Sequence, residues 1–348
     1  MASEPELAAM RLAAELAARG RPTTLPNPVV GCVILAADGN RVGEGWHERP
    51  GSPHAEVNAL AAAGDRARGG TAVVTLEPCN HTGRTGPCTQ ALIRAGIARV
   101  VIGVADPGVP AGGGAAALRA AGVEVEVDVL RDLAEQANRP WLTAVRLGRP
   151  FVTWKFGATL DGRVAAADGT SRWITGPAAR ADVHRLRAEC DAVIVGIGTV
   201  LADDPLLTVR PADGSVPAGQ PLRVVVDSRG RTPSDARVRD GSAPTWVATA
   251  AEVGSGPGGR VDLDRLLGLL FGRERRHLLL EGGPALAGAF LAAGLVDEVV
   301  GYLAPVLLGS GPAALAGGGV GTIAEAHRFE LVDLTRIGDD VRITCRPR

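Results

Sequence analysis

Four residues in the first third of the chain have types and spacing that suit metal chemistry. His54 and Glu56 stand two positions apart, and Cys79 and Cys88 follow further along. One imidazole and two thiolates leave the fourth corner of a tetrahedral zinc site open for water, which distinguishes catalytic from structural zinc sites. Zinc makes hydroxide available near neutral pH, and a carboxylate such as Glu56 can relay its proton. The pattern therefore predicts a hydrolytic zinc centre.

The order His-x-Glu and then Pro-Cys is typical of the zinc nucleobase deaminases. In this chain the eight residues 80–87 separate the two cysteines, where that pattern has two. We expect this longer loop to bulge over the site, and its polar side chains suit a phosphorylated substrate. Two alternatives stay open: a structural zinc knot with His47 or His81 as fourth ligand, and buried groups that bind no metal.

The elements around these residues should position them. Ser52 is expected to cap a helix that starts at Pro53, so that His54 lies in its first turn. Residues 71–76 form a predicted buried strand that ends just before Cys79. Cys88 should open a helix, where the free N–H groups of the first turn favour a thiolate.

The first half continues as alternating strands and helices, which predicts a layered α/β domain with a largely parallel sheet. We expect helices at residues 4–19, 88–95, 115–120 and 130–146 and strands at residues 29–35, 43–46, 100–104 and 123–127. Gly148-Arg149-Pro150 breaks the last helix, which gives domains 1–147 and 148–348. No Ser/Gly-rich linker separates them, so we expect the domains to dock.

The second half predicts another α/β unit, whose last strands form an antiparallel edge. We expect strands at residues 151–156, 192–196, 223–227, 245–248, 277–280, 296–303 and across 331–344, and helices at 177–190 and 263–270. Gly198-Thr199 is predicted to be a turn, and Asp203 or Asp204 to cap the next turn. His184 and His277 are predicted to be structural.

The run Glu281-Gly282-Gly283-Pro284 lies between a predicted strand and a predicted helix. Such a turn can cradle a phosphate, because glycines let the backbone approach and the helix N-terminus favours an anion. Glycine-rich turns of this kind also arise for steric reasons alone, and this alternative stays open. The Rossmann glycine fingerprint is missing after the first strand of this half, so any dinucleotide site here has another design.

Composition argues against several functional classes. The formal net charge is −1 and aromatic residues make up 3%, so neither the basic surface nor the stacking platforms of a nucleic-acid-binding protein are evident. Every apolar stretch is too short for a membrane span. The acidic, helical N-terminus is unlike a signal peptide and predicts a cytoplasmic protein. Cys32, Cys190 and Cys345 are expected to be small core residues.

Lys155 is the only lysine among 37 basic residues. A lysine offers a compact point charge and a proton that a guanidinium does not release. We therefore consider a functional role for Lys155, although its chance survival explains the same observation equally well.

Several motifs together resemble one family, the bifunctional deaminase/reductases of riboflavin biosynthesis. The resemblance covers nearly the whole chain and rests on Cys79-Asn80-His81-Thr82-Gly83-Arg84-Thr85-Gly86-Pro87-Cys88, Lys155 with Leu160-Asp161-Gly162-Arg163, Ser171-Arg172-Trp173-Ile174-Thr175-Gly176 and Thr199-Val200-Leu201-Ala202-Asp203-Asp204-Pro205. It implies an N-terminal three-layer domain similar to cytidine deaminases and a C-terminal α/β domain similar to dihydrofolate reductase. It also implies zinc-dependent deamination of a diaminopyrimidinone that carries a phosphoribosylamino group, and NADPH-dependent reduction of the ribosyl side chain to ribityl.

The resemblance assigns roles by position. Zinc would be held by His54, Cys79 and Cys88, with Glu56 relaying protons. The first substrate would contact Asn27, His47, His81 and Arg84, the last at a position where lysine also occurs. In the second domain the substrate positions are Lys155, Ser171, Ile174, Thr175, Arg187, Leu207, Arg210 and Glu281, and the NADPH positions are Ala158, Trp173, Thr199, Asp203, Ser228, Gly282, Gly283 and Gly288.

Within that assignment, four side chains have a stated chemistry. Arg187 and Arg210 offer forked donors for the substrate phosphate. Lys155 and Glu281 are the candidates for moving the protons that opening of the sugar ring requires. An arginine is also expected to meet the 2′-phosphate of NADPH, and the sequence does not select one.

Two rival functions remain. A nucleic-acid-editing zinc deaminase with an appended binding domain would share the metal site, but the near-neutral charge argues against it. A non-enzymatic sensor of a purine-derived ligand is disfavoured because both sites are complete. Members of the resembled family commonly self-associate, so a homo-oligomer, either a dimer or a tetramer, is expected.

Overall fold

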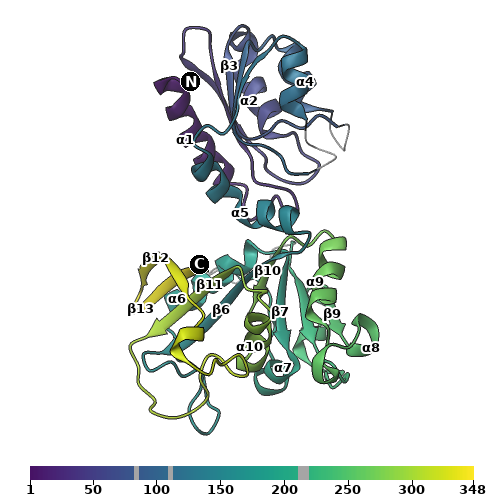
Figure 1. Cartoon of the computed structure of the whole chain (residues 1–348), viewed down its shortest axis with the longest axis vertical. Helices are drawn as coiled ribbons and strands as arrows, with labels where there is room; N and C mark the ends of the chain where they lie inside the picture. Colours follow the sequence, from purple (N-terminus) through teal and green to yellow (C-terminus); the bar gives the residue numbers. More distant parts are fainter. Residues whose placement is uncertain (82–85, 109–112, 211–218) are drawn as a thin grey trace. The chain divides into compact units, whose positions relative to one another are not determined.

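The computed structural model describes residues 1–81, 86–108, 113–210 and 219–348. It divides into two compact units, Met1–Gly148 and Arg149–Arg348 (Figure 1). Each unit has one sheet of its own, with helices on both faces. Within the described residues, no helix is both long and apolar enough to cross a membrane.

The sheet of the first unit has the strand order β2-β1-β3-β4-β5. Its strands are β1 (Gly31–Leu35), β2 (Arg41–Trp46), β3 (Thr71–Leu76), β4 (Arg99–Val104) and β5 (Glu124–Glu126). Strand β1 pairs antiparallel with β2 and with β3, whereas the β3–β4 and β4–β5 pairs are parallel. The prediction of a largely parallel sheet was wrong, because β1 runs antiparallel to both of its neighbours and only two of the four pairs are parallel.

Helices cover both faces of this sheet (Figure 1). They are α1 (Glu4–Ala18), α2 (Ala55–Ala63), α3 (Cys88–Arg94), α4 (Gly114–Ala120) and α5 (Arg131–Leu147), with a 3-10 turn at Gly64–Ala67. Side chains of β1 alternate between the two faces: Ile34 packs in the cluster that includes α2, α3 and α4, and Val33 packs in the cluster that includes α1. The result is the three-layer α/β/α arrangement that the sequence predicted.

Glycines in β2 let α2 approach the sheet closely. A Cβ atom on Gly45 would lie 2.4 Å from the carbonyl oxygen of Ala55, and one on Gly43 would lie 2.2 Å from that of Ala59. The contacting face of α2 is made of alanines, which adds little bulk. The first turn of α2, with Glu56, is therefore fixed by backbone packing against β2.

The sheet of the second unit has the strand order β12-β13-β11-β6-β10-β7-β8-β9. Its strands are β6 (Phe151–Thr159), β7 (Ala192–Gly196), β8 (Leu222–Val226), β9 (Thr245–Ala248), β10 (His277–Leu280), β11 (Glu298–Ala304), β12 (Phe329–Ile337) and β13 (Asp340–Pro347). In the run β11-β6-β10-β7-β8-β9, every pair of neighbouring strands is parallel. Strand β13 pairs antiparallel with both β11 and β12. This confirms the predicted antiparallel edge.

Buried apolar strands form the middle of this sheet, as expected for strands covered on both faces. The helices are α6 (Pro177–Ala188), α7 (Ile197–Asp203), α8 (Ala250–Val253), α9 (Leu263–Gly272) and α10 (Pro284–Ala292), with 3-10 turns η2 (Arg237–Arg239), η3 (Pro257–Gly259) and η4 (Ile323–Glu325). Helices α9 and α10 share one buried cluster with Ile194, while α7 shares another with Val193. The neighbouring side chains of Val193 and Ile194 in β7 therefore pack on opposite faces of the sheet.

Two local predictions for the second unit were wrong. Gly198 and Thr199 lie inside helix α7 and form no isolated turn, because Ile197 and Val200 bury their side chains in the core and hold the helix in place. Strand β6 extends past Phe156 to Thr159, because its pairing with β11 continues to the Thr159–Ala304 pair.

The close approach of β2 and α2 gives a testable expectation. Gly45→Ala adds a methyl group that overlaps the Ala55 carbonyl, so we expect a loss of about 1–3 kcal/mol in unfolding free energy, as for other overpacked cores. We also expect reduced zinc content, because the first turn of α2 must shift. Urea denaturation and metal analysis of the purified protein measure both.

The matched control is Gly268→Ala in α9, where an added Cβ meets no atom within 4 Å. Because alanine favours a helix over glycine, this variant should be as stable as the wild type or slightly more stable. If Gly45→Ala behaves like this control, the packing argument is wrong.

Candidate metal centre and cofactor cavity

The three predicted metal ligands converge in the first unit. His54 Nδ1 lies 3.2 Å from the Sγ atom of Cys88 and 3.6 Å from that of Cys79, and all three atoms lie within 4.8 Å of one another. With Zn–N bonds of about 2.0 Å and Zn–S bonds of about 2.3 Å, a tetrahedral site places N and S roughly 3.5 Å apart. The donor set and its spacing therefore fit zinc.

Three different elements supply these ligands. His54 is the extended residue before α2, Cys79 follows β3, and Cys88 is the first residue of α3. The prediction that Ser52 caps this helix was wrong. The helix starts at Ala55, and the Ser52 hydroxyl instead donates to the Arg49 carbonyl at 2.7 Å, closing the turn before the site.

Glu56 lies in the first turn of α2, where 3% of it is exposed. Burial raises the pKa of its carboxyl group above the ordinary range, although the nearby His54 partly opposes this effect. Its side chain hydrogen-bonds with that of Cys88. A carboxyl group with a raised pKa beside the ligands is suited to take up and release a proton.

The cysteines also show the electrostatics of a cation site. The hydrogen bond from Cys88 lowers the pKa of Cys79 to about 4, with a further contribution from His54. The same hydrogen bond, together with burial, raises the pKa of Cys88. The amide of Cys88 donates to the Cys79 sulfur at 3.4 Å, which adds to the stabilisation of the Cys79 thiolate.

Asn27 and His47 lie beside this centre. The Nδ2 atom of Asn27 is 3.1 Å from His47 Nε2, and the His47 and His54 rings meet edge to face with centroids 5.2 Å apart. Burial lowers the pKa of His47, which keeps this imidazole neutral. His81 is exposed, and Arg84 falls outside the described residues.

The metal-binding group contains no fourth protein ligand among the described residues. It consists of His54, Cys79 and Cys88, and neither His47 nor His81 belongs to it. This arrangement favours an open coordination position over the structural zinc knot.

Glu77 supports the site, and the sequence interpretation gave it no role. Its buried carboxylate accepts hydrogen bonds from the amide of Asp106 at 3.1 Å and from the amide of Ala115 at 2.8 Å. The end of β3 is thus tied to the loop after β4 and to helix α4. In the sequence, the position of Glu77 between the predicted buried strand 71–76 and the predicted ligand Cys79 could have indicated this supporting role.

A cavity of about 1460 Å³ lies in the second unit. It follows the carboxyl ends of neighbouring strands, and its walls include residues 155–157, 196–199, 281–286 and 256–264. Because β10, β7 and β8 are parallel, the segments that leave them emerge at one edge of the sheet. The volume exceeds that of a usual small-ligand pocket, so a dinucleotide and a second ligand both have room.

Lys155, Glu281 and Arg187 form one charged group at this cavity. The Nζ atom of Lys155 lies 3.2 Å from Glu281, and Arg187 contacts both carboxylate oxygens of Glu281 at 2.5 and 3.0 Å. Burial alone would raise the pKa of Glu281, but the charges of Arg187 and Lys155 outweigh it and lower this pKa. Glu281 is therefore ionised and holds both cations in place.

The cavity brings together most of the positions proposed for the second unit. The predicted residues that line it are Lys155, Ser171, Trp173, Ile174, Thr175, Thr199, Asp203, Ser228, Glu281, Gly282 and Gly283. Those that do not are Ala158, Arg187, Leu207, Arg210 and Gly288. Ala158 is fully buried. A Cβ on Gly288 would lie 2.0 Å from the Ala316 carbonyl, so the close packing of α10 against this loop residue explains the glycine.

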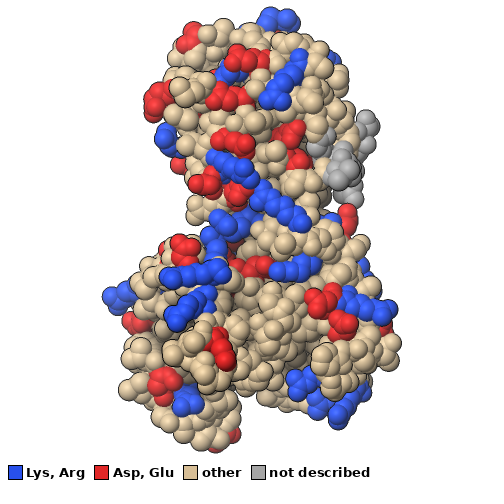
Figure 2. Space-filling model, in the orientation of Figure 1, with Lys and Arg blue, Asp and Glu red and all other residues tan. Residues whose placement is uncertain are grey.

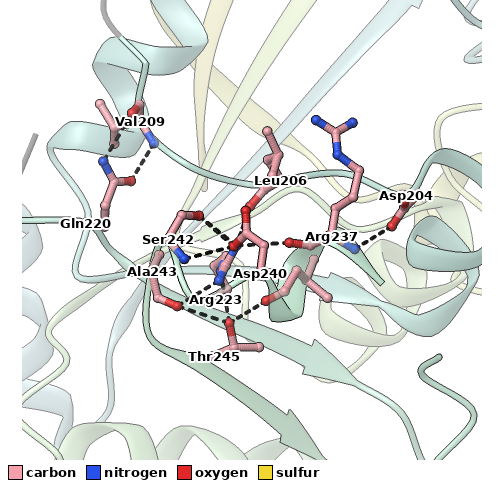
Figure 3. Close-up of polar contacts among 11 residues, drawn as sticks. Asp204, Leu206, Val209, Gln220, Arg223, Arg237, Asp240, Ser242, Ala243 and Thr245 are labelled. Carbon is pink, nitrogen blue, oxygen red and sulfur yellow. Dashed lines mark hydrogen bonds and ion pairs between the residues drawn. The ribbon is translucent and has the colours of Figure 1, made fainter. Parts of the chain in front are cut away.

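Leu207 and Arg210 belong to residues 204–210, which side chains from elsewhere in the unit hold in place. Arg187 donates to the Thr208 carbonyl at 3.0 Å, and the Arg210 amide donates to His184 Nδ1 at 3.2 Å. Asp204 accepts from the amide of Arg237 at 2.8 Å (Figure 3). The predicted cap on the following turn is therefore wrong for Asp204, because its carboxylate bonds to η2.

Arg223 anchors the same segment from inside the core. Its side chain is 0% exposed, and its guanidinium donates to the carbonyls of Leu206 at 3.1 Å and Ala243 at 2.7 Å and to Asp240 at 2.9 Å (Figure 3). A buried arginine is tolerated only when its donors are satisfied and its charge is paired. One residue of β8 thus links residues 204–210 to the segment before β9.

Comparison with known proteins decides the family. Residues 150–343 match the family described as RibD C-terminal domain, and residues 3–104 match the cytidine and deoxycytidylate deaminase zinc-binding region. A riboflavin biosynthesis protein RibD from Mycobacterium tuberculosis is 47% identical over 341 residues, which cover 98% of this chain and 97% of the relative. The chain belongs to the RibD family. The RibD of Escherichia coli is 45% identical over 355 residues, covering 95% of this chain and 96% of its own.

Solved structures agree with this membership. Acinetobacter baumannii RibD superposes with a TM-score of 0.89 at 39% identity, covering 99% of both chains. A Thermotoga maritima diaminohydroxyphosphoribosylaminopyrimidine deaminase/5-amino-6-(5-phosphoribosylamino)uracil reductase gives 0.88 at 35% identity, again covering 99% of both. Membership in the RibD family confirms the predicted fold class and a bifunctional deaminase and reductase of riboflavin biosynthesis. The zinc-binding region contains His54, Cys79 and Cys88.

His184 gives a pH-dependent prediction for this RibD chain. Burial, together with the charges of Arg187 and Arg210, lowers the pKa of His184 to about 4, against about 6.5 in an unfolded chain. Between these values the unfolded state binds more protons, so the stability contribution present above pH 6.5 is lost as the pH falls towards 4.

His184→Asn removes this titration and keeps an acceptor for the Arg210 amide. We expect the unfolding free energy of the wild type, measured in urea, to fall more steeply below pH 6.5 than that of the variant. Parallel pH profiles for the two proteins would contradict the assignment of this effect to His184.

Proposed function

We propose that the first unit deaminates a diaminopyrimidinone that carries a phosphoribosylamino group, with zinc, and that the second unit reduces the ribosyl side chain of the product to ribityl with NADPH. The observation that carries this proposal is the pairing, in one RibD chain, of the His54–Cys79–Cys88 trio beside buried Glu56 with a dinucleotide-sized cavity beside Lys155. The activities named for the Thermotoga maritima relative support the same substrates.

In the first unit, bound zinc would supply Lewis acidity that lowers the pKa of a water molecule. Glu56 takes the proton of the attacking water and passes it to the departing amino group, which leaves as ammonia. Its buried position and raised pKa suit both halves of this transfer. Residues two apart at a helix start point in different directions. His54 can therefore bind the metal while Glu56 transfers the proton.

Neutral Asn27 and His47 would orient the pyrimidine at this centre. The Asn27 amide and the His47 imidazole already contact each other at 3.1 Å, which fixes the amide and the ring in one arrangement. A neutral imidazole and an amide both donate and accept, as the edge of a diaminopyrimidinone requires. His81 and Arg84 stay predicted contacts to the same substrate.

In the second unit, NADPH would supply a hydride for the first carbon of the opened sugar. The turn Gly282-Gly283 lets the pyrophosphate approach the N-terminus of α10, and the Gly283 amide donates to Thr199 Oγ1 at 3.1 Å, which fixes the turn. Trp173, Asp203 and Ser228 line the same cavity. Ala158 and Gly288 do not line the cavity, so they would affect NADPH binding only through the packing around it.

Ring opening leaves a carbonyl or imine at the first carbon, and its reduction needs one hydride and one proton. Lys155 supplies the proton, because it borders the cavity and is held 3.2 Å from Glu281. Glu281 is a weak base at its lowered pKa, so we assign it to positioning Lys155. Arg187 is engaged with Glu281, which leaves Arg210 as the candidate for the substrate phosphate.

The face of the molecule seen in Figure 2 gives no support to the nucleic-acid-editing alternative. Figure 2 shows Lys and Arg interspersed with Asp and Glu on the face in view, with no broad field of one sign over its described residues. Binding to nucleic acid depends on neutralising many phosphates at once. A cytoplasmic location and a homo-oligomer stay predictions.

Glu56→Gln tests the deaminase assignment. The amide cannot relay a proton, so ammonia release should fall about 10²–10⁴-fold, the usual contribution of general acid–base catalysis. Zinc content should be unchanged because the three ligands remain. Reduction of the already deaminated pyrimidine by the same protein is the internal control, and retained ammonia release would contradict the assignment.

Lys155→Ala and Lys155→Arg test the second unit. Both should lower NADPH oxidation with the deaminated substrate by at least about 10²-fold, because neither side chain releases a proton near neutral pH. Arginine keeps the ion pair with Glu281 and so controls for loss of charge. If Lys155→Arg oxidises NADPH at the wild-type rate, Lys155 contributes only its charge.

A further inference from the structure

Trp173 is largely exposed although it borders the cavity of the second unit. The residue is 69% exposed, and it is one of those that line the cavity. An indole offers a large flat face on which a planar ring can stack, and an exposed indole gains little stability from burial. The ring is therefore placed to meet a ligand, provided that a neighbour holds it in position.

The guanidinium group of Arg180 supplies that contact. It lies over the Trp173 ring with its central carbon 4.5 Å from the ring centroid, well within the range of cation–π attraction. The corresponding carbon of Arg172 lies 6.0 Å from the centroid, at the limit of that range. Arg172 instead donates to the Asp203 carbonyl at 2.6 Å. Arg180 is therefore the closer partner of the indole.

Arg180 lies near the start of α6, on a part of the helix that is itself fixed. Ala179 and Val183 bury their side chains in the cluster that joins α6 to β11. The Nη1 atom of Arg180 also donates to the Thr175 carbonyl at 2.6 Å. One guanidinium group thus contacts both the indole and the backbone two residues further along.

The backbone around the indole has anchors of its own. The buried carboxylate of Asp340 accepts from the Gly176 amide at 2.7 Å. The Ile174 amide donates to the Ser171 carbonyl at 3.1 Å, which closes a turn. Loss of the Arg180 side chain should therefore free the indole without releasing the loop that carries it.

This loop forms the cavity wall close to Lys155. A Cβ atom on Gly157 of β6 would lie 3.2 Å from the methyl carbon of Thr175, so the loop packs against β6 at this glycine. Gly157 and Lys155 are two residues apart on one strand, so they share a face, and both line the cavity. Trp173 therefore belongs to the part of the wall where NADPH must place its reactive ring.

We propose that Arg180 is a positioning residue of the reductase, which holds the Trp173 indole as a preformed wall for the nicotinamide end of NADPH. The inference rests on the proposed reductase function. Arg180 is not among the described residues that line the cavity, so it acts through Trp173 and not on the coenzyme. A side chain that is ordered before binding loses less conformational entropy when the ligand arrives, which strengthens binding.

A double-mutant cycle tests this coupling on the zinc-loaded full-length protein. The proteins are the wild type, Arg180→Gln, Trp173→Ala and the double variant, and calorimetry measures their affinity for NADPH. Arg180→Gln should weaken NADPH binding about 3–10-fold, the usual cost of ordering one side chain. In the Trp173→Ala background the same change should alter the affinity by less than about 2-fold, because the ring that Arg180 positions is gone.

Steady-state kinetics separate positioning from a loss of folded protein. With the deaminated pyrimidine as substrate, Arg180→Gln should raise the KM for NADPH about 3–10-fold and leave kcat within about 2-fold of the wild type. A change that only reduced the amount of folded enzyme would lower kcat and leave KM unchanged, which would contradict the proposal.

Arg273→Gln is the matched control. The central guanidinium carbon of Arg273 lies 4.0 Å from the centroid of the Trp246 ring in the same unit, and neither residue is among the described ones at the cavity wall. The control removes a contact of the same kind, so it should leave NADPH affinity at the wild-type value. If it weakens NADPH as much as Arg180→Gln does, the effect comes from general destabilisation and the inference is wrong.

Two further outcomes would overturn the inference. One is equal weakening by Arg180→Gln in the wild-type and Trp173→Ala backgrounds, because Arg180 would then act independently of the indole. The other is unchanged NADPH affinity in Arg180→Gln. Failure of the wild type to bind NADPH would instead overturn the proposed reductase function.

Discussion

Both sites depend on one constraint, that neighbouring parallel strands end at the same edge of a sheet and release their continuing segments there. In the first unit β3 and β4 end side by side, and Glu77 joins their continuations by accepting from the amides of Asp106 and Ala115. In the second unit, β10, β7 and β8 release Glu281, Thr199 and Ser228 in spatial order. Residues far apart in sequence become neighbours because the strands before them are neighbours.

Electrostatic pairing then decides what each polar group can do. Glu56 is buried beside one imidazole and two sulfur atoms, and it keeps a raised pKa. Glu281 is buried as well, yet two cations lower its pKa. The same side-chain type is thus suited to exchange protons in one unit and to fix a lysine in the other, which is a difference of neighbours and not of burial.

Much of this could be predicted from the sequence. The His54, Cys79 and Cys88 spacing defined the metal site, because metal ligands of fixed type leave few alternatives, and the apolar runs located nearly all strands. The antiparallel pairing of β1 with β3 and the longer β6 could not be predicted, since both depend on pairing between distant strands. The role of Arg223 was equally hidden, because among so many arginines only the surroundings reveal which one is buried in the core.

Each unit supplies its own chemistry from its own residues. All three metal ligands come from Met1–Gly148, and the described walls of the cavity come from Arg149–Arg348. The two activities therefore share no side chain that the structure places at either site. Evolution can tune, weaken or replace one half without rebuilding the other, so descendants of such a chain are free to keep a single activity and pass the intermediate to a separate protein.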